Sequence, residues 1–97
     1  MILIGLANLT GFWAGHPRAR KPLEAWKSLV EKNAFKHFAH SKQTFGAVDY
    51  VPPGTVFDVG GNKYRVVAVM DFHTQISVVK EVMTHDEYDS WSKRRKR

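Results

Sequence analysis

The stretch 55–83, TVFDVGGNKYRVVAVMDFHTQISVVKEVM, decides the fold because it contains three strand-like segments in succession. Residues 55–59 predict a first strand, and the Gly-Gly-Asn of 60–62 predicts a tight turn, since these residues accept the positive φ that hairpin turns need. Residues 63–72 and 75–83 predict two more strands, because both are rich in β-branched side chains. We therefore expect an antiparallel meander of about residues 55–83.

The residues after the meander predict a short helix that begins at His85. Thr84 and Glu87 match a capping box, in which the hydroxyl and the carboxylate each accept a backbone N–H at the start of the helix. Acidic residues in the first turn also suit the helix dipole. Tyr88 and Trp91 would therefore follow directly after the third strand.

The first third of the chain predicts a short edge strand at 2–4 and two helices. Apolar residues at helical spacing begin at Leu6, and His16-Pro17 ends this first helix. The second helix starts at about 18 or 22 and ends near 33. Its apolar stripe consists of Leu23, Trp26, Leu29 and Val30.

Residues 35–54 show no sustained periodicity, and we interpret them as irregular. A loop of this length in a small domain is often functional or a docking surface. Its aromatic side chains would either pin the loop to the core or stack on bases, and we expect the first.

Length and composition bound the class of protein. Ninety-seven residues, 43% hydrophobic and 25% charged, indicate one globular α+β domain, which we place at 1–92, with a basic tail at 93–97. The absence of cysteine excludes a disulfide scaffold, a cysteine-ligated metal site and a cysteine nucleophile. The apolar opening has no basic segment before it, so we expect neither an export signal nor a membrane span, and a cytoplasmic location.

The net charge of +6 is unevenly distributed. Residues 1–43 carry seven Lys/Arg against two Glu, residues 44–92 carry three against seven acids, and the tail adds five basic residues. A basic helical half and a basic tail favour a polyanionic partner such as RNA or a ribosomal surface, while simple solubility is the alternative reading.

The meander predicts a cluster of functional groups on one sheet face. If the second hairpin has a two- or four-residue loop, Lys80 lies opposite Val67 and diagonally next to Arg65. Buried cations need an anion, which would be Asp71 or Glu81 within the chain, or a phosphate. His85 and Tyr88, three residues apart on the last helix, would project near the same edge.

Together these residue types fit a metal-free ribonuclease. Arg65 and Lys80 would stabilise charge on phosphorus, while His85 and Tyr88 would transfer protons as a ribose 2′-OH attacks the adjacent phosphate. Each residue also has a purely structural or solvated alternative. A His37/His40 pair has no third ligand nearby, so we expect no metal site and no cofactor.

The segments VFDVGGNKYRVVA at 56–68 and EVMTHDEYD at 81–89 resemble the HigB toxins of bacterial type II toxin–antitoxin modules, within the RelE-like group. The resemblance implies a RelE-like fold with an N-terminal helical pair packed on a mostly antiparallel sheet and a short C-terminal helix. It also implies an endoribonuclease that cuts messenger RNA in the ribosomal A site. A HigA-type antitoxin with a helix-turn-helix would neutralise it, and operator DNA would be bound only through that complex.

When the family's motifs are carried over by position, the resemblance implies that Arg65 holds the scissile phosphate and that His85 and Tyr88 lie at the site. Asn62 and Lys63, in the turn, would contact RNA. The roles of general base and general acid stay unassigned.

Two other functions remain open at this point. One is a ribosome- or RNA-binding module with the same fold that blocks translation without cleavage. The other is a DNA-binding regulator, which would need a helix-turn-helix that the Pro17 junction between the helices does not provide.

Overall fold

The computed structural model describes residues 1–45 and 47–95 of the chain. Its elements are, in order, β1 (Ile2–Ile4), α1 (Leu6–Gly15), η1 (Pro17–Ala19), α2 (Arg20–Lys32), α3 (Phe38–Phe45), β2 (Val48–Val51), β3 (Gly54–Val59), β4 (Tyr64–Asp71), β5 (Ile76–Thr84) and α4 (His85–Arg95). The strands form one sheet in the order β1-β5-β4-β3-β2, in which β1 pairs parallel to β5 and every other pair is antiparallel. The predicted α+β fold is confirmed and agrees with a RelE-like architecture.

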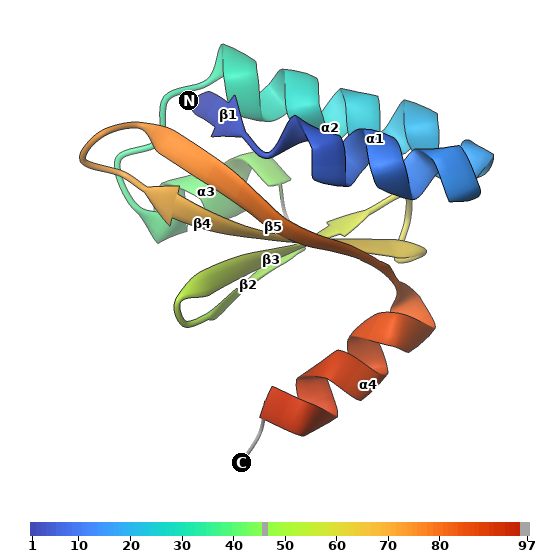
Figure 1. The fold of residues 1–97 in the computed structure, drawn as a ribbon. Coiled ribbons are helices and arrows are strands. Elements are labelled where there is room, and N and C mark those ends of the chain that lie inside the picture. Colours follow the sequence, from blue (N-terminus) through green and yellow to red (C-terminus); the bar gives the residue numbers. More distant parts are fainter. Residues whose placement is uncertain (46, 96–97) are drawn as a thin grey trace.

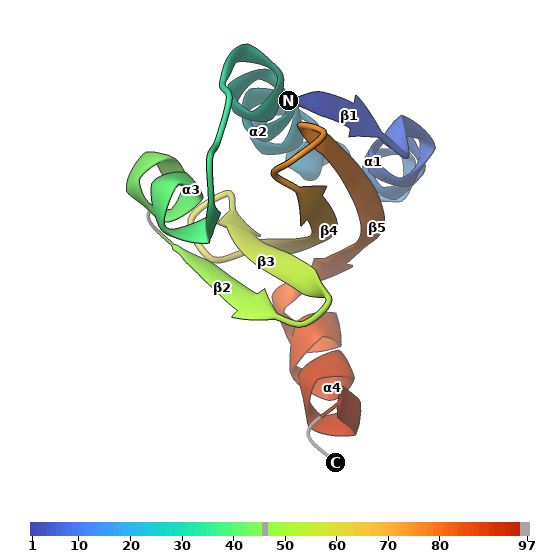
Figure 2. The ribbon, with the colours of Figure 1, turned by 90° about the vertical axis from the view of Figure 1, so that its left-hand side faces the viewer.

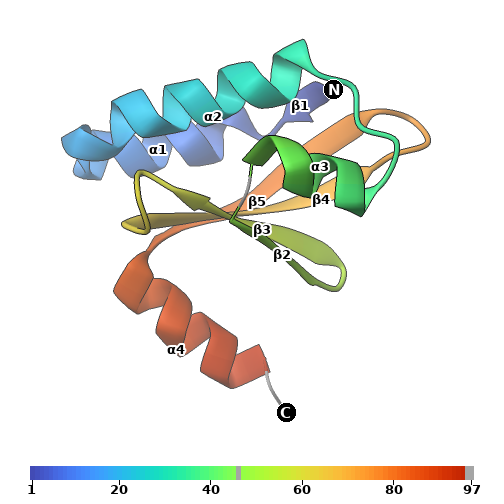
Figure 3. The same cartoon turned by 180° about the vertical axis from the view of Figure 1, so that it is seen from behind.

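The sheet has two unlike faces. Helices α1 and α2 lie side by side on one face, which we call the core face, and α4 lies on the opposite side, which we call the outer face (Figures 1 and 2). Seen from behind, α3 sits beside β2 and β3 (Figure 3). None of the helices described is long and apolar enough to cross a membrane.

The main core lies between α1, α2 and the core face. Its fully buried side chains come from both helices and from the three central strands, and burial of each stabilises the fold by roughly 1.5–3 kcal/mol. These side chains include Leu9, Leu23, Val30, Phe57, Val66 and Val79. The predicted stripe of the second helix is largely confirmed, with Leu29 as its exposed member.

The prediction that 35–54 is irregular is wrong, because this segment contains α3 and β2. Both elements are short, and they depend on tertiary partners: β2 pairs with β3, and the Phe45 ring packs on Phe57 at 4.9 Å between centroids. Phe35 is 1% exposed. The expectation that aromatics pin this segment to the core is therefore confirmed.

The Gly-Gly-Asn turn forms as predicted. Gly60, Gly61 and Asn62 all have positive φ, at 69°, 62° and 77°. This backbone lets β3 run directly back into β4, with Val59 paired to Tyr64. The turn therefore brings the ends of two strands to one corner of the sheet.

The second hairpin keeps the predicted register only near its turn. Asp71 pairs with Ile76 and Ala68 with Val79, as a four-residue loop requires. Beyond Ala68 the register shifts by one residue, because β5 contains a bulge at Lys80.

This bulge sets the pairings beyond it and overturns an expected one. Val67 lies opposite Glu81, and Arg65 lies opposite Met83. The expectation that Lys80 lies opposite Val67 is therefore wrong, since Lys80 is the extra residue that leaves the regular ladder.

The β4–β5 turn is held by the Asp71 carboxylate, which accepts the backbone N–H groups of His73 at 3.0 Å and Thr74 at 3.2 Å. The bond from Thr74 is the largest cause that lowers the pKa of Asp71 below its ordinary value of 3.8. Since the folded pKa is below the unfolded one, the charged carboxylate stabilises the fold above the unfolded pKa.

We expect the variant Asp71→Asn to lose this contribution. The difference in melting temperature from wild type should stay constant from pH 7 to about 5 and shrink as the pH falls below about 4, where the carboxylate of the wild type is protonated. Thermal melts by circular dichroism across this range measure it. A difference that persists at the acid end would contradict a charge-dependent turn.

Candidate active site at the end of the sheet

Arg65 is a buried charge on the outer face of β4, with 6% of its surface exposed. Its Nε forms an ion pair with Asp58 Oδ1 at 2.9 Å, and Asp58 is its direct cross-strand partner on β3. Asp71 and Glu81, the possible anions within the chain that the sequence suggested, are therefore not its ion-pair partners. The pairing follows from the first hairpin, whose turn sets Asp58 opposite Arg65.

The remaining donors of Arg65 tie the turn and α4 together. Nη1 donates to the carbonyl oxygens of Asn62 at 3.2 Å and Tyr64 at 3.1 Å. Nη2 donates to the side-chain oxygen of Asn62 and to Nδ1 of His85, the latter at 3.0 Å. A guanidinium has five N–H groups, so each terminal nitrogen is fully used.

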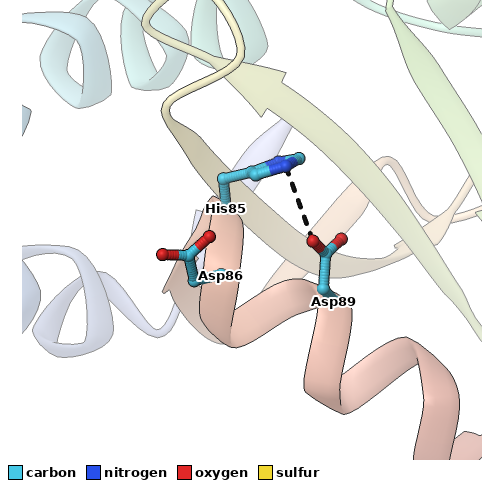
Figure 4. Close-up of side chains that lie close together, drawn as sticks. All are labelled: His85, Asp86 and Asp89. Carbon is cyan, nitrogen blue, oxygen red and sulfur yellow. Dashed lines mark ion pairs between the residues drawn. The ribbon is translucent and has the colours of Figure 1, made fainter.

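His85 lies between Arg65 and an acid of its own helix. Its Nε2 is 3.5 Å from Asp89 Oδ2, one helical turn further along (Figure 4). Because a guanidinium can only donate, Nδ1 accepts, and the proton of the neutral ring is on Nε2, directed at Asp89. The ring is therefore oriented by contacts at both nitrogens.

Tyr88 completes the cluster from the next turn of α4. The Arg65 guanidinium carbon lies 5.4 Å from the centre of the Tyr88 ring, within cation–π range. Tyr88 also stacks with Trp91 at 5.6 Å between centroids. Trp91 is 8% exposed and packs with Val56, Val67 and Met83 in a second, smaller core on the outer face.

The capping box fixes where α4 begins. The Thr84 N–H donates to Glu87 Oε1 at 2.8 Å, and the Glu87 N–H donates to Thr84 Oγ1 at 3.2 Å, as predicted. The His85 N–H also donates to the Lys63 carbonyl oxygen at 3.0 Å. These bonds attach the first turn of α4 to the β3–β4 turn, which sets His85 beside Arg65.

The structure thus brings together four of the six predicted site residues: Arg65, His85, Tyr88 and Asn62. Lys63 contributes its backbone here, and its side chain is exposed. Lys80 lies in the bulge, on the wall of a groove that Trp91 also lines. In the described part of the chain, neither lysine is among the polar partners of Arg65.

Two residues of the site, Asp58 and Asp89, were not predicted from the sequence. Asp58 could have been found by applying register to the first hairpin as well as to the second. Asp89 could have been found from its i, i+4 spacing to His85, which places both on one face of a helix.

His85, Asp86 and Asp89 offer ligand atoms within 4.8 Å of one another (Figure 4). Both nitrogens of His85 already have partners, and one of these is the positively charged Arg65. A cation here would have to displace the ion pair and tolerate the adjacent guanidinium. The geometry therefore fits an acid-oriented histidine better than a metal ligand.

The predicted basic tail starts inside the last helix. Helix α4 continues to Arg95, so residues 93–95 of the expected tail are helical, while 96–97 lie outside the described residues. Lys93 and Arg94 are exposed. The positive charge at this end of the chain is therefore carried, in part, on a helical surface.

Loss of the capping hydroxyl should loosen the first turn of α4. We expect Thr84→Ala to lower the free energy of unfolding by about 1 kcal/mol, whereas Thr84→Ser, which keeps the capping hydroxyl, should be as stable as wild type. Urea denaturation followed by circular dichroism measures both. Equal stability of the two variants would show that the hydroxyl does not hold the helix start.

Comparisons with known proteins agree with this architecture. The family model described as "HigB_toxin, RelE-like toxic component of a toxin-antitoxin system" matches residues 19–91. The chain is 39% identical over 77 residues to the mRNA interferase toxin HigB of Escherichia coli K12, a match that covers 76% of this chain and 74% of the relative. The mRNA interferases HigB of Escherichia coli O157:H7 and Shigella flexneri match with the same identity and coverage. This chain belongs to the HigB family of RelE-like toxins.

Proposed function

We propose that this chain is the toxin of a toxin–antitoxin pair and an endoribonuclease that cuts messenger RNA on the translating ribosome in the cytoplasm, without a metal ion. A HigA-type antitoxin neutralises it, and operator DNA is bound only through that complex. The observation that carries the proposal is the convergence of Arg65, His85 and Tyr88. These residues come from two elements, and they meet on one face of the sheet.

Substrate binding starts at Arg65. A phosphate oxygen replaces the Asn62 and His85 acceptors on Nη2, while Asp58 and two backbone carbonyls keep the guanidinium in place. A charged acceptor makes a stronger hydrogen bond with a guanidinium than a neutral amide or imidazole does. The exchange frees the side chain of Asn62, exposed in the turn beside Lys63, to contact RNA.

The same exchange frees Nδ1 of His85 to act as the base. It takes the proton of the ribose 2′-OH while Nε2–H stays directed at Asp89. The 2′ oxygen then attacks phosphorus, the bond to the 5′ oxygen breaks, and the products carry a 2′,3′-cyclic phosphate and a 5′-hydroxyl. We assign to Tyr88, which contacts both Arg65 and Trp91, the role of donating a proton to the leaving oxygen.

The charge distribution supports action on the ribosome. Ion pairs with Glu24 and Glu31 occupy Arg20 and Lys27 on α2. The other basic side chains of the N-terminal half that are exposed are Arg18, Lys21, Lys32, Lys36 and Lys42. Ribosomal RNA is a dense phosphate surface for these side chains to bind, and a ribosome that holds the message at the site would supply much of the rate through positioning.

One observation favours the alternative, a module that binds the ribosome and blocks translation without cleavage. Both terminal nitrogens of Arg65 are fully hydrogen-bonded within the chain, and the side chain is 7% exposed. If phosphate cannot displace His85, Arg65 is purely structural. Cleavage itself therefore decides between the two functions.

The test is an in vitro translation reaction programmed with a reporter mRNA, with new 5′ ends mapped after addition of the purified protein. We expect His85→Ala and Tyr88→Phe to reduce cleavage roughly 10²–10⁴-fold. His73→Ala, which removes an exposed histidine from the β4–β5 turn, is the matched control and should cleave like wild type. Translation blocked by wild type without new RNA ends would establish the non-catalytic alternative.

Asp86→Asn separates metal-free from metal-dependent chemistry in the same assay. Asp86 belongs to the acidic cluster, whereas the contact to His85 comes from Asp89. We expect Asp86→Asn to keep wild-type cleavage, because no step uses its carboxylate. A loss comparable to that of His85→Ala would contradict the metal-free mechanism.

A further inference from the structure

The outer face of the sheet carries an apolar band that α4 does not cover. On β1, Leu3 is 8% exposed and belongs to the main core, so strand alternation turns Ile2 and Ile4 to the opposite face, where they are 63% and 48% exposed. These are large apolar side chains in water. Because they lie on an edge strand, they would promote aggregation unless a partner covers them.

The band continues from this edge across the sheet. Ile4 pairs with Val78 on β5, and Val78 pairs with Val69 on β4, so the three side chains form one row on the outer face. Val69 then leads into a groove between the sheet and α4. Its walls are Val51, Pro53, Gly54, Val67, Val69, Lys80, Glu81 and Trp91. We call Ile2, this row and the groove together the outer band.

The chemistry of the outer band indicates a polypeptide occupant rather than RNA. Its row consists of aliphatic side chains without hydrogen-bond donors for phosphate, and it starts at a β-strand edge that can pair with another backbone. A second copy of this chain is disfavoured, because it would bring two molecules of net charge +6 together. The occupant is therefore another protein.

The charged residues around the groove indicate which charge the partner segment carries. Lys80 lines the groove, and Arg94, three residues after Trp91, lies on the same face of α4. Glu81 is the acid on its wall. The surface thus suits a segment with apolar residues on one face and acidic residues along its flank.

We propose that the outer band is the docking surface for such an apolar–acidic segment of the antitoxin. This inference rests on the part of the proposed function that pairs this toxin with an antitoxin, and not on the cleavage mechanism. Trp91 lines the groove and stacks on Tyr88, which contacts Arg65, so two rings separate an occupant of the groove from the guanidinium. The bound antitoxin segment would then neutralise the toxin by covering α4 and blocking the access of RNA to the site.

The test uses the cognate antitoxin, purified and titrated by calorimetry into this toxin. The double variant Ile2→Lys/Ile4→Lys places two charges on the outer band without touching the site. We expect its affinity to fall at least tenfold while mRNA cleavage remains that of wild type. In cells, this variant should stay toxic and no longer be rescued by the antitoxin.

The matched control is Leu29→Lys, since Leu29 is 43% exposed on α2, away from the outer face. We expect it to bind the antitoxin like wild type. Lys80→Glu, read by affinity alone, tests the charge of the groove and should also weaken binding. Melting curves establish that each variant is folded.

Hydrogen exchange on the wild-type complex gives a second, mutation-free readout. We expect protection at residues 2–4 and at the β2–β3 turn. Unchanged affinity of the double variant, or an antitoxin footprint confined to α1 and α2, would overturn the proposal. If the double variant cleaved less mRNA but bound the antitoxin with unchanged affinity, the proposal would also be overturned, and the outer band would be assigned to RNA binding. If wild type does not cleave mRNA, the cleavage proposal fails while the binding data still decide the surface.

Discussion

The ion pair between Arg65 and Asp58 is the constraint on which the arrangement of this molecule's site depends. A guanidinium with 7% of its side chain exposed would cost of the order of several kcal/mol to bury without partners. Here the carboxylate faces it across the β3–β4 ladder, and the turn and α4 supply the other acceptors. One side chain thereby fixes the relative positions of a hairpin and a helix.

Local structures with independent causes converge on this guanidinium. Positive φ at Asn62 turns both its carbonyl and its side chain toward Arg65. The capping box at Thr84 starts α4 at the residue that must face the guanidinium. The turn and the capping box each depend only on neighbouring residues. The contacts around Arg65 therefore form whenever the β3–β4 hairpin and α4 form.

The two faces of the sheet bury different kinds of side chain. The core face buries the apolar side chains of α1 and α2, and the outer face holds a buried cation, a small aromatic core and an uncovered apolar row. The bulge at Lys80 separates these parts of the outer face, since it shifts the register between the Arg65–Met83 pair and the Val69–Val78 pair. In the proposed assignment, the catalytic site and the surface for the antitoxin are adjacent but distinct parts of this face.

The sequence by itself determined what depends on neighbours along the chain: the meander, the Gly-Gly-Asn turn, the capping box and the amphipathic second helix. It also predicted the meeting of Arg65 with His85 and Tyr88, because two short connections leave little freedom. Only the tertiary structure decided the helix and strand within 35–54 and the bulge at Lys80. Those features arise from contacts between distant segments and from packing, which can override weak local preference and leave no periodic signal in the sequence.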